Sequence, residues 1–287
     1  MVKTNQKYDD LSKGLLVSKI CSLKNQTAEN IGQNKMVSKI QMGIDRDEFT
    51  LFYQPEYNLD TKKIIGVEAL VRWISPGKGI ITPNVFIPLA EKTDLIYKLD
   101  RMIICKALEQ KQRWEQEGLG HIELSINISS KSIESEDDCS VIEEIISSYK
   151  VIYNTIIFEI TETVVITNVI LAMDRLNRLK KYGIRFALDD FGTGYSSFVH
   201  LIKLPIDIIK IDRSFISLIP DSIEETSITK NILTMAHDLN FKVVAEGIET
   251  NAQLEYLQQN SCEGGQGFLL CVPLPSEQVS MVIKEIM

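Results

Sequence analysis

Acidic and amide side chains follow apolar, β-prone runs at intervals along the chain. Each run reads as a strand, and helix-like segments separate one run from the next. Because the carboxyl ends of parallel strands meet at one mouth of a barrel, these side chains are expected to gather there. Like charges in such a cluster repel one another unless cations are present, so the pattern predicts a metal site. The candidate ligands are Glu68, Asn127, Glu159, Asp189, Asp190 and Glu246.

The types of these side chains indicate which metal the site would hold. Carboxylate and amide oxygens are hard ligands that suit Mg²⁺ or Mn²⁺, whereas zinc usually draws His or Cys. The three histidines, His121, His200 and His237, lie outside the strand ends. The adjacent Asp189 and Asp190 could address two ions, as in two-metal phosphoryl displacement. Any single acid could instead be a helix N-cap or a solvated turn residue, but that reading does not account for the whole series.

Two basic residues fall near the same mouth. Lys210 ends the run 206–209, and it could hold or deprotonate an attacking water, with a pKa lowered by partly buried surroundings. Its alternative role is that of an ion-pair partner for the acids. Arg72 lies four residues beyond Glu68 and suits bidentate contact with a phosphate, although a surface ion pair would also account for it.

The letters DFG at residues 190–192 match the magnesium motif of protein kinases. The chain contains neither the HRD loop nor the GxGxxG loop of that family, so a kinase is excluded. Gly192 and Gly194 are interpreted instead as allowing positive φ in a tight loop. Ser196 and Ser197 are expected to cap the following helix.

The elements that must position these residues alternate between strand and helix. Such alternation predicts right-handed β-α-β units and a parallel sheet, and the strand count favours a closed barrel over an open, doubly wound sheet. A polar turn at 60–63 joins the first two strands as an antiparallel hairpin. The expected strands are 49–57, one ending at Glu68, 122–128, 156–161, 185–189, 206–211, 242–246 and 266–270, and the expected helices are 37–42, one opening at Pro83, 95–117, 139–149, 168–181, 223–239, 251–259 and one from Ser276.

Capping residues support several of these helix boundaries. Thr82 before Pro83 predicts a hydroxyl cap followed by proline at the first helical position. Thr250 and Gln253 form a capping-box pair, and Gly183 is placed to end the helix 168–181.

Composition is that of an ordinary soluble globular protein. The chain has 287 residues, 44% of them hydrophobic, which is enough for one α/β barrel with a large core. The net charge of −8 argues against binding a nucleic acid polymer. Five cysteines without a CxxC pair predict reduced thiols, and neither a signal peptide nor a membrane span is visible. The expected location is the cytoplasm.

Joined in order, these segments resemble the EAL-domain cyclic di-GMP phosphodiesterases of bacterial signalling. The resemblance runs from about residue 36 to the C-terminus, and the joint order of the motifs is far more specific than the three letters EAL. The motifs are EALVR at 68–72, YQP at 53–55, NIS at 127–129, EITE at 159–162, DDFGTG at 189–194 with the serines at 196 and 197, LPID at 204–207, KID at 210–212, AEGIE at 245–249 and QGF at 266–268.

This resemblance implies a modified TIM (β/α)8 barrel with one antiparallel strand, and hydrolysis of cyclic di-GMP to linear pGpG. Lys210 and Glu68 would be catalytic, with Lys210 assisting the water, and Arg72 would contact a substrate phosphate. The chain would be a homodimer, and Glu162 would steady the loop 190–197. Two ions, Mg²⁺ or Mn²⁺, would bind at the mouth. Their ligands would be Glu68, Asn127, Glu159, Asp189, Asp190 and Glu246. Gln54, Glu249 and Gln266 would line the substrate site.

Two departures from the family pattern stand out. Glu56 occupies a position after YQP that is usually apolar, and Val272 replaces a common arginine before Pro273. The first could alter the electrostatics near the substrate. The expected domain division is an extension of unknown function at 1–35 and a phosphodiesterase domain at 36–287. The alternative function is a catalytically silent cyclic di-GMP receptor that regulates a partner protein.

Overall fold

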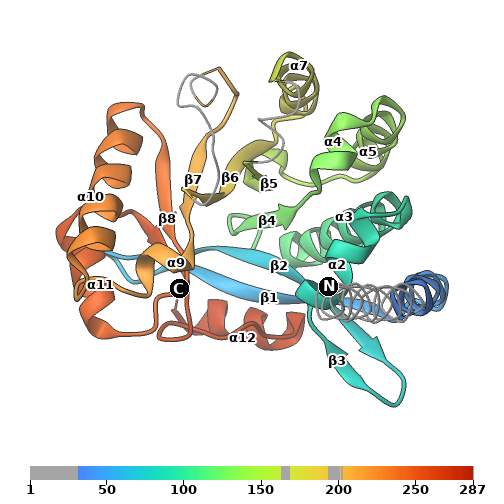
Figure 1. Cartoon of the computed structure of the whole chain (residues 1–287), viewed down its shortest axis with the longest axis horizontal. Helices are drawn as coiled ribbons and strands as arrows, with labels where there is room; N and C mark the ends of the chain where they lie inside the picture. Colours follow the sequence, from blue (N-terminus) through green and yellow to red (C-terminus); the bar gives the residue numbers. More distant parts are fainter. Residues whose placement is uncertain (1–31, 163–168, 193–200, 202, 287) are drawn as a thin grey trace, which may run out of the picture.

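Strands and helices alternate around a central barrel (Figure 1). The computed structural model describes residues 32–162, 169–192, 201 and 203–286. Residues 32–45 are helical and lead into the first strand. The strands are β1 (Phe49–Asn58), β2 (Ile64–Ser75), β3 (Gly79–Ile81), β4 (Glu123–Asn127), β5 (Ile156–Thr161), β6 (Arg185–Phe191), β7 (Ile208–Ile211), β8 (Lys242–Ala245) and β9 (Gly264–Gly265). The helices are α2 (Pro83–Glu91), α3 (Leu95–Gln116), α4 (Ser130–Glu134), α5 (Glu136–Ser148), α7 (Val169–Lys180), α9 (Arg213–Ile216), α10 (Ile223–Asp238), α11 (Asn251–Gln259) and α12 (Ser276–Ile286), with a 3₁₀ turn at Tyr153–Thr155.

The sheet closes because β1 pairs on both sides. The strand order is β1-β9-β8-β7-β6-β5-β4-β2-β3, and an additional pairing of β1 with β2 completes the ring and leaves β3 outside it. β1 runs antiparallel to both β2 and β9, whereas β2 and β4 through β9 pair in parallel. The expected barrel with one antiparallel strand is therefore confirmed, and so is the hairpin at 60–63. Closure rules out the doubly wound alternative.

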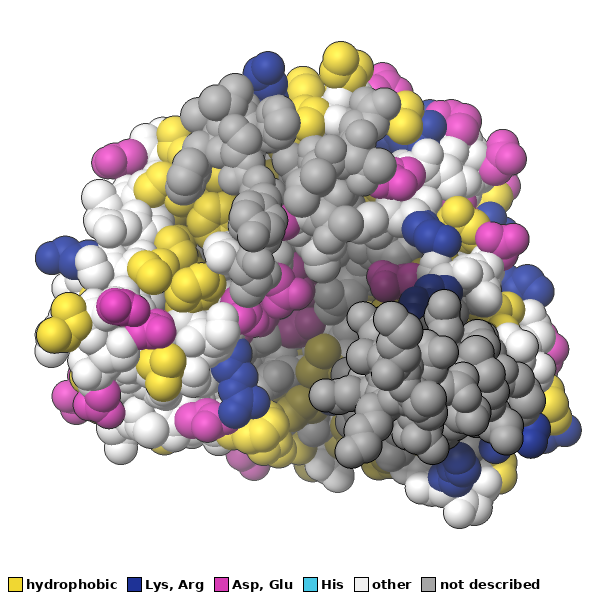
Figure 2. All heavy atoms as spheres, in the orientation of Figure 1, with side chains coloured by type: hydrophobic (Ala, Val, Ile, Leu, Met, Phe, Trp, Pro, Cys, Tyr) yellow, Lys and Arg dark blue, Asp and Glu magenta, His cyan; other side chains and the backbone are white. Residues whose placement is uncertain are grey.

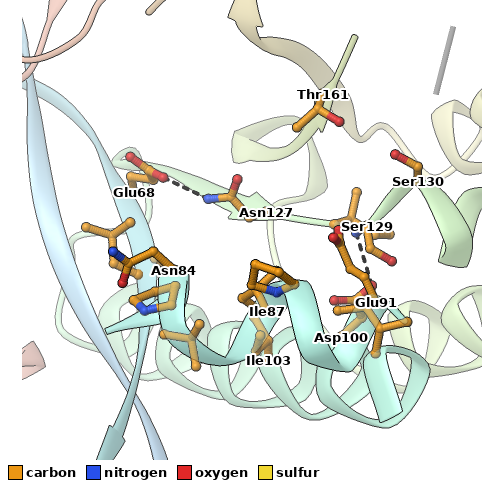
Figure 3. A pocket seen from close by; sticks show the side chains of 17 residues that line it. Glu68, Asn84, Ile87, Glu91, Asp100, Ile103, Asn127, Ser129, Ser130 and Thr161 are labelled. Atoms are coloured by element: carbon orange, nitrogen blue, oxygen red, sulfur yellow. Dashed lines mark hydrogen bonds between the residues drawn. The ribbon is translucent and has the colours of Figure 1, made fainter. Parts of the chain in front are cut away.

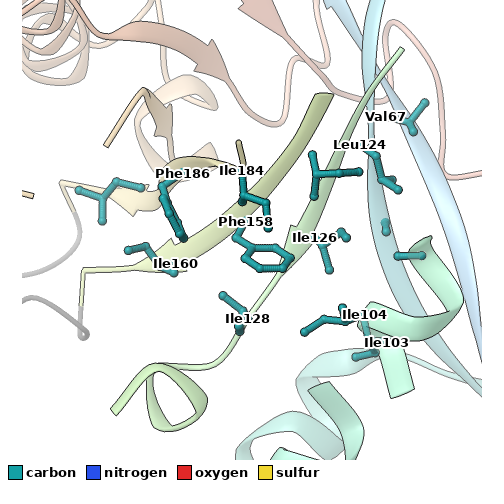
Figure 4. Close-up of a cluster of buried hydrophobic side chains, with 14 of the residues drawn as sticks. Val67, Ile103, Ile104, Leu124, Ile126, Ile128, Phe158, Ile160, Ile184 and Phe186 are labelled. Carbon is teal, nitrogen blue, oxygen red and sulfur yellow. The ribbon is translucent and has the colours of Figure 1, made fainter. Parts of the chain in front are cut away.

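The two-residue period of the strands separates an outer apolar layer from an inner polar one. Outward side chains of β2, β4, β5 and β6 belong to the main hydrophobic core, and Figure 4 shows them along the strands, with Ile103 and Ile104 of α3 in the same cluster. The intervening residues face inward, as successive side chains of a strand point to opposite faces. The outward set includes Val67, Leu124, Ile126, Phe158, Ile160 and Phe186.

A second, small core fills the inside of the barrel. It consists of Ile157, Ala187, Ile208 and Val244, one from each of β5 to β8. Each of them precedes a polar residue of the site by two positions in the sequence and therefore faces the same side of its strand. The polar residues are Glu159, Asp189, Lys210 and Glu246. The barrel floor is thus apolar, and the polar side chains are displayed above it at the carboxyl ends of the strands.

Two local expectations are wrong. The strand expected at 266–270 is instead the short β9 at Gly264–Gly265, and the following chain turns, with Leu270 N donating to Gly267 O at 3.0 Å. Backbone packing explains the difference, because a Cβ on Gly267 would lie 2.2 Å from Ile248 N and O. Thr82 does precede Pro83 at the N-terminus of α2, but its hydroxyl donates to Asn84 Oδ1 at 2.6 Å and does not cap the helix.

Other boundaries differ in ways that local chemistry explains. α5 begins at Glu136, three residues before the expected 139, because Ser135 Oγ accepts from Asp138 N and three acids fill the first turn, where the helix dipole favours them. β3 was not expected. The capping box of Thr250 and Gln253 is confirmed, and Gly183, with φ of 94°, follows the end of α7.

Candidate functional site

The acidic and amide side chains predicted at strand ends converge at one mouth of the barrel. The strand expected to end at Glu68 is wrong in its bounds, because β2 continues to Ser75 in its pairing with β1 and β3. Strand register places Glu68 beside Ser125, Asn127 beside Glu159, and Asp189 beside Thr161. Backbone pairing joins Glu246 N to Ile211 O at 3.0 Å, next to Lys210. Seen from the same side as the barrel in Figure 1, acidic side chains gather near the middle of the molecular face (Figure 2).

Glu68 is fixed by two amide side chains. Asn127 Nδ2 donates to Glu68 Oε1 at 2.7 Å, as Figure 3 shows, and Gln266 Nε2 donates to Glu68 Oε2 at 2.6 Å. Gln266 Nε2 also reaches Glu246 Oε1 at 3.1 Å. The ammonium of Lys210, with the hydrogen bonds from Gln266 and Asn127, outweighs burial and lowers the pKa of Glu68. Glu68 is therefore held as a carboxylate.

Lys210 is the central cation of the site. Its side chain is 1% exposed, and Nζ lies 2.6 Å from Glu246 Oε1, 2.8 Å from Glu159 Oε1, 3.3 Å from Glu68 Oε2 and 3.9 Å from Asp189 Oδ1. The expectation of a lowered pKa is wrong. Burial alone would lower the pKa of Lys210, but the surrounding carboxylates outweigh it and hold the pKa well above the ordinary value. The ion-pair role of this lysine is present in the geometry.

One lysine does not neutralise the acids around it. Burial, with the repulsion between neighbouring carboxylates, raises the pKa of Glu246 to about 8 and that of Asp190 to about 6. The same causes raise the pKa of Glu159 and of Asp189. The site is therefore short of positive charge.

A divalent cation fits this arrangement. Carboxylate oxygens of Asp189, Asp190 and Glu246 lie within 4.8 Å of one another. Within the described part of the chain, Glu159 Oε2 is buried and finds no hydrogen-bond donor. All these ligand atoms are oxygens, the donor set that hard cations such as Mg²⁺ prefer.

The adjacent acids Asp189 and Asp190 lie at an irregularity near the end of β6. Asp190 has φ of 53°, and the pairing of β6 with β7 shifts register between Leu188 and Phe191. Gly192, with φ of 97°, donates its N–H to Glu162 Oε1 at 2.7 Å, and a Cβ there would lie 2.8 Å from the Phe215 ring. Glu162 thus contacts the start of the loop. The rest of that loop, with the expected caps Ser196 and Ser197, lies outside the described residues.

The remaining sequence candidates lie around this cluster, each held by another partner. Gln54 pairs in register with Glu68, and its Nε2 donates to Cys271 O at 3.0 Å. The half-buried Arg72 donates to Val71 O at 2.9 Å, and its guanidinium lies 5.9 Å from the centre of the Phe52 ring. No salt bridge to Arg72 occurs among the residues that the structure describes, so the surface ion pair is not observed. Glu249 pairs with Arg213 at the rim.

Two further acids lie beside the predicted ligands: Glu56, which the sequence singled out only as a departure from the family pattern, and Asp212, to which it gave no role. Glu56 is buried inside the barrel, opposite Gly66 in register, and a Cβ on Gly66 would lie 3.1 Å from Glu56 Oε2. Burial raises the pKa of Glu56 to about 7, against the opposing effect of Lys210. Asp212, just after β7, adds to the negative charge at Asp190. The two-residue spacing from Gln54 to Glu56 is the signal that could have placed Glu56 inside.

A pocket of about 390 Å³ adjoins Glu68 and Asn127 (Figure 3). Its walls come from β2, α2, α3 and the residues after β4, and they are largely apolar apart from a few polar groups. This is the composition of a site that buries a flat organic group beside a polar anchor. The apolar lining includes Leu70, Val71, Pro83, Ile87, Pro88, Ile96, Ile103 and Ile128.

Asp100 forms a buried polar anchor at the base of this pocket. Its Oδ2 accepts hydrogen bonds from Ser132 Oγ at 2.7 Å and from Ser129 N at 3.0 Å. Burial nevertheless raises the pKa of Asp100 to about 6. Because the folded protein holds this proton more tightly than the unfolded chain does, the associated stability is full below about pH 4 and is lost as the pH rises through 6.

Between pH 4 and pH 7 the wild type is expected to lose about 3 kcal/mol of stability through Asp100, at about 1.4 kcal/mol per pKa unit. Asp100→Asn should not show this loss, because asparagine does not titrate. The asparagine oxygen can keep both hydrogen bonds. Urea unfolding at pH 4 and pH 7 measures the difference, with the exposed Asp94→Asn as the control that should follow the wild type. An Asp100→Asn protein with the same pH dependence as the wild type would contradict the assignment.

No helix in the described ranges is both long enough and apolar enough to cross a membrane.

Comparisons with known proteins agree with this geometry. The EAL domain family model matches residues 37–273. Cyclic di-GMP phosphodiesterase PA2567 of Pseudomonas aeruginosa is 36% identical over 248 residues, which cover 85% of this chain and 42% of that protein. The chain spans less than half the length of the curated relatives MucR and PA2567.

Solved structures extend the likeness to three dimensions. The MucR phosphodiesterase, in complex with c-di-GMP, has a TM-score of 0.82 and 34% identity, covering 85% of this chain and 99% of that one. The EAL enzyme Bd1971, with cAMP and cyclic di-GMP bound, has a TM-score of 0.84 and 31% identity, covering 89% of this chain and 70% of that one. With the family match extending over most of the barrel, the chain belongs to the EAL domain family.

Proposed function

We propose that this chain hydrolyses one phosphodiester bond of cyclic di-GMP to give linear pGpG. The observation that carries the proposal is the buried cluster in which Lys210 meets carboxylates from β2, β5, β6 and the residue after β8. Family membership supports the choice of substrate, as do two relatives: MucR, whose structure is a complex with c-di-GMP, and PA2567, a cyclic di-GMP phosphodiesterase.

The proposed cofactor is a pair of Mg²⁺ or Mn²⁺ ions. The ligands would be Glu68, Asn127, Glu159, Asp189, Asp190 and Glu246, whose oxygens suit these cations. When bound, such ions stabilise negative charge on the oxygens of a transferring phosphoryl group and promote the nucleophile. Their positive charge would also offset the excess of negative charge that raises the pKa of the acids at the mouth.

The protein groups divide the remaining work. Lys210, a cation by its raised pKa, would donate a hydrogen bond from Nζ to the attacking water and hold it in line. The water oxygen would bond to phosphorus and release one proton to solvent, the bond from phosphorus to the 3′ oxygen would break, and that oxygen would take up one proton from solvent. Glu68, fixed by Asn127 and Gln266, would keep the cluster in one geometry during this step.

The pocket beside Glu68 would bind one guanine. Its apolar walls suit a flat base, and Arg72, next in sequence to Val71 of the pocket wall, would meet a phosphate. Gln54, Gln266 and Glu249 would line the rest of the substrate site. Glu162 would steady the loop that begins at Gly192.

The deciding test is incubation of the purified protein with cyclic di-GMP and Mg²⁺ or Mn²⁺, followed by chromatography of the nucleotides. Conversion to pGpG that EDTA stops is the expected result. Tight binding of cyclic di-GMP without product under any divalent cation would replace the enzyme with the receptor alternative. Absence of both binding and turnover would reject the substrate.

We also propose a domain boundary near residue 36 and a homodimer. A fragment of residues 36–287 should retain activity and the thermal transition of the full chain. Light scattering coupled to size exclusion should give twice the chain mass of 32.6 kDa.

A further inference from the structure

Arg213 stands at the rim of the barrel mouth, on the side of β7 and β8. It follows Asp212, directly after β7, and opens the short helix α9. Its side chain is 60% exposed, and its guanidinium makes an ion pair with Glu249 Oε1 at 2.8 Å. An exposed ion pair adds little to the free energy of unfolding, so stability alone does not explain why this pair is present.

The backbone beside the pair is shaped to receive this arginine. A Cβ on Gly247 would lie 2.4 Å from Arg213 Cγ and 2.8 Å from Arg213 Cβ. Gly247 has φ of 70°, which favours glycine, and it directly follows the proposed metal ligand Glu246. The arginine stem therefore lies across the chain immediately next to the metal cluster.

The acid of the pair is fixed as well. Gln253 Oε1 accepts from Glu249 N at 2.8 Å and from Thr250 N at 2.9 Å, within the capping box of α11. This fixes the backbone from which Glu249 reaches Arg213. A guanidinium has five N–H donors in a planar fork, so pairing with one carboxylate leaves donors for an anion.

The negative charge on this side of the mouth explains why an arginine would help to bind an anionic substrate. Asp190, Asp212, Glu246 and Glu249 make this side of the mouth acidic. Cyclic di-GMP carries two phosphodiester groups, one negative charge on each, and the metal cluster would accommodate only the group that is cleaved. An unpaired Glu249 would repel the other group, whereas Arg213 neutralises Glu249 and keeps further N–H donors for the phosphate.

On this basis we propose that Arg213 binds the phosphodiester group that is not cleaved, and that Glu249 is a positioning residue that acts through Arg213. The proposal rests on the proposed function for its substrate. It changes the role of Glu249, which would orient the arginine and not contact the nucleotide itself.

Four variants test this assignment: Arg213→Gln, Arg213→Lys, Glu249→Gln and the double variant. Arg213→Gln should raise the KM for cyclic di-GMP about tenfold or more, as loss of a charge-assisted hydrogen bond predicts, with kcat changed less than about threefold. Arg213→Lys should recover part of the loss. Glu249→Gln should raise KM less than Arg213→Gln. In the Arg213→Gln background it should raise KM no further and should recover part of the loss, because it removes the repulsion of the unpaired carboxylate.

A small substrate separates this role from a general structural one. Bis(4-nitrophenyl) phosphate has a single phosphodiester group, so its KM should not change in any of the variants. The exposed Arg46→Gln is the control for loss of a surface charge, and melting temperatures should stay within a few degrees of the wild type. An unchanged KM for cyclic di-GMP in Arg213→Gln, or equal rises for both substrates, would overturn the proposal.

Equilibrium dialysis of cyclic di-GMP in EDTA keeps the question separate from turnover. If the wild-type protein binds cyclic di-GMP here but gives no product with any added divalent cation, the proposed reaction is removed, yet weaker binding by Arg213→Gln would still support this site. Equal dissociation constants for the two proteins would reject it. Full additivity of the Arg213→Gln and Glu249→Gln effects would reject the positioning role alone.

Discussion

Lys210→Met is expected to lower kcat for cyclic di-GMP by about 10²–10⁴-fold, the range for loss of a positioned proton-transfer or hydrogen-bonding group. It should also destabilise the metal-free protein by about 3–5 kcal/mol, because it leaves buried carboxylates without their cation. The ammonium has oxygens of Glu246 and Glu159 at 2.6 and 2.8 Å, and methionine keeps the unbranched chain up to the position of the nitrogen without the charge.

The pH dependence of this destabilisation has a definite sign. Without the lysine, the pKa of Glu159, Asp189 and Glu246 rises further, so the folded state favours their protonated forms still more. Acids with a raised folded pKa cost stability above their unfolded pKa, and the loss in Lys210→Met should therefore be larger at pH 8 than at pH 5. Urea unfolding in EDTA at both pH values measures it.

The control for Lys210→Met is Lys284→Met. Lys284 pairs with Glu117 at 2.7 Å, but both side chains are about half exposed, so the change should cost less than about 1 kcal/mol and leave kcat unchanged. Mg²⁺ should restore part of the stability lost in Lys210→Met, since it supplies positive charge to the same acids. Similar stability losses in the two variants would show that the buried cluster does not depend on Lys210.

The sequence predicted the barrel well because local patterns and strand geometry agree. The two-residue period of the strands points Val67 and Leu124 outward into the core and Glu68 and Ser125 inward. An apolar run followed by an acid therefore predicts that the acid lies inside the barrel. The capping box at Thr250 is a local hydrogen-bond pattern, and it appeared where it was expected.

Features that depend on contacts between distant parts of the chain could not be predicted from local sequence patterns. β9 consists of two glycines, which have no strand propensity, and it forms because β8 and β1 approach from either side. The apolar residues just after it gave the stronger local signal, yet contact between Gly267 and the Ile248 backbone turns the chain there.

The charge state of Lys210 shows the same limit within the site. A lysine in an apolar strand suggests desolvation and a lowered pKa. Its four carboxylate neighbours come from β2, β5, β6 and the end of β8, and only the closed barrel brings them within 4 Å of one ammonium. The sequence could predict that these carboxylates gather at one mouth, but it could not predict the balance of charge among them.

Glu68→Gln is expected to reduce kcat by at least about 10²–10³-fold, comparable to the loss of a single preorganised electrostatic contact in an active site. The two carboxylate oxygens accept from Asn127 Nδ2 and Gln266 Nε2, and both partners are donors. A glutamine has one oxygen and one NH₂ group, so in either orientation one amide donor faces another. The change therefore disrupts the cluster although it preserves the shape of the side chain.

This conflict between donors gives Glu68→Gln a signature that loss of charge alone does not have. Leaving a buried donor unpaired costs about 1–3 kcal/mol, so Glu68→Gln should lower the stability measured by urea unfolding in EDTA. The double variant Glu68→Gln with Gln266→Glu returns an acceptor to one side of the contact, and it should recover stability without recovering kcat, since the carboxylate has moved away from its position on β2. Exposed Glu285→Gln serves as the control for both measurements. Wild-type turnover in Glu68→Gln would remove Glu68 from the mechanism, and recovery of kcat in the double variant would show that the net charge of the cluster, and not the position of this carboxylate, sets the rate.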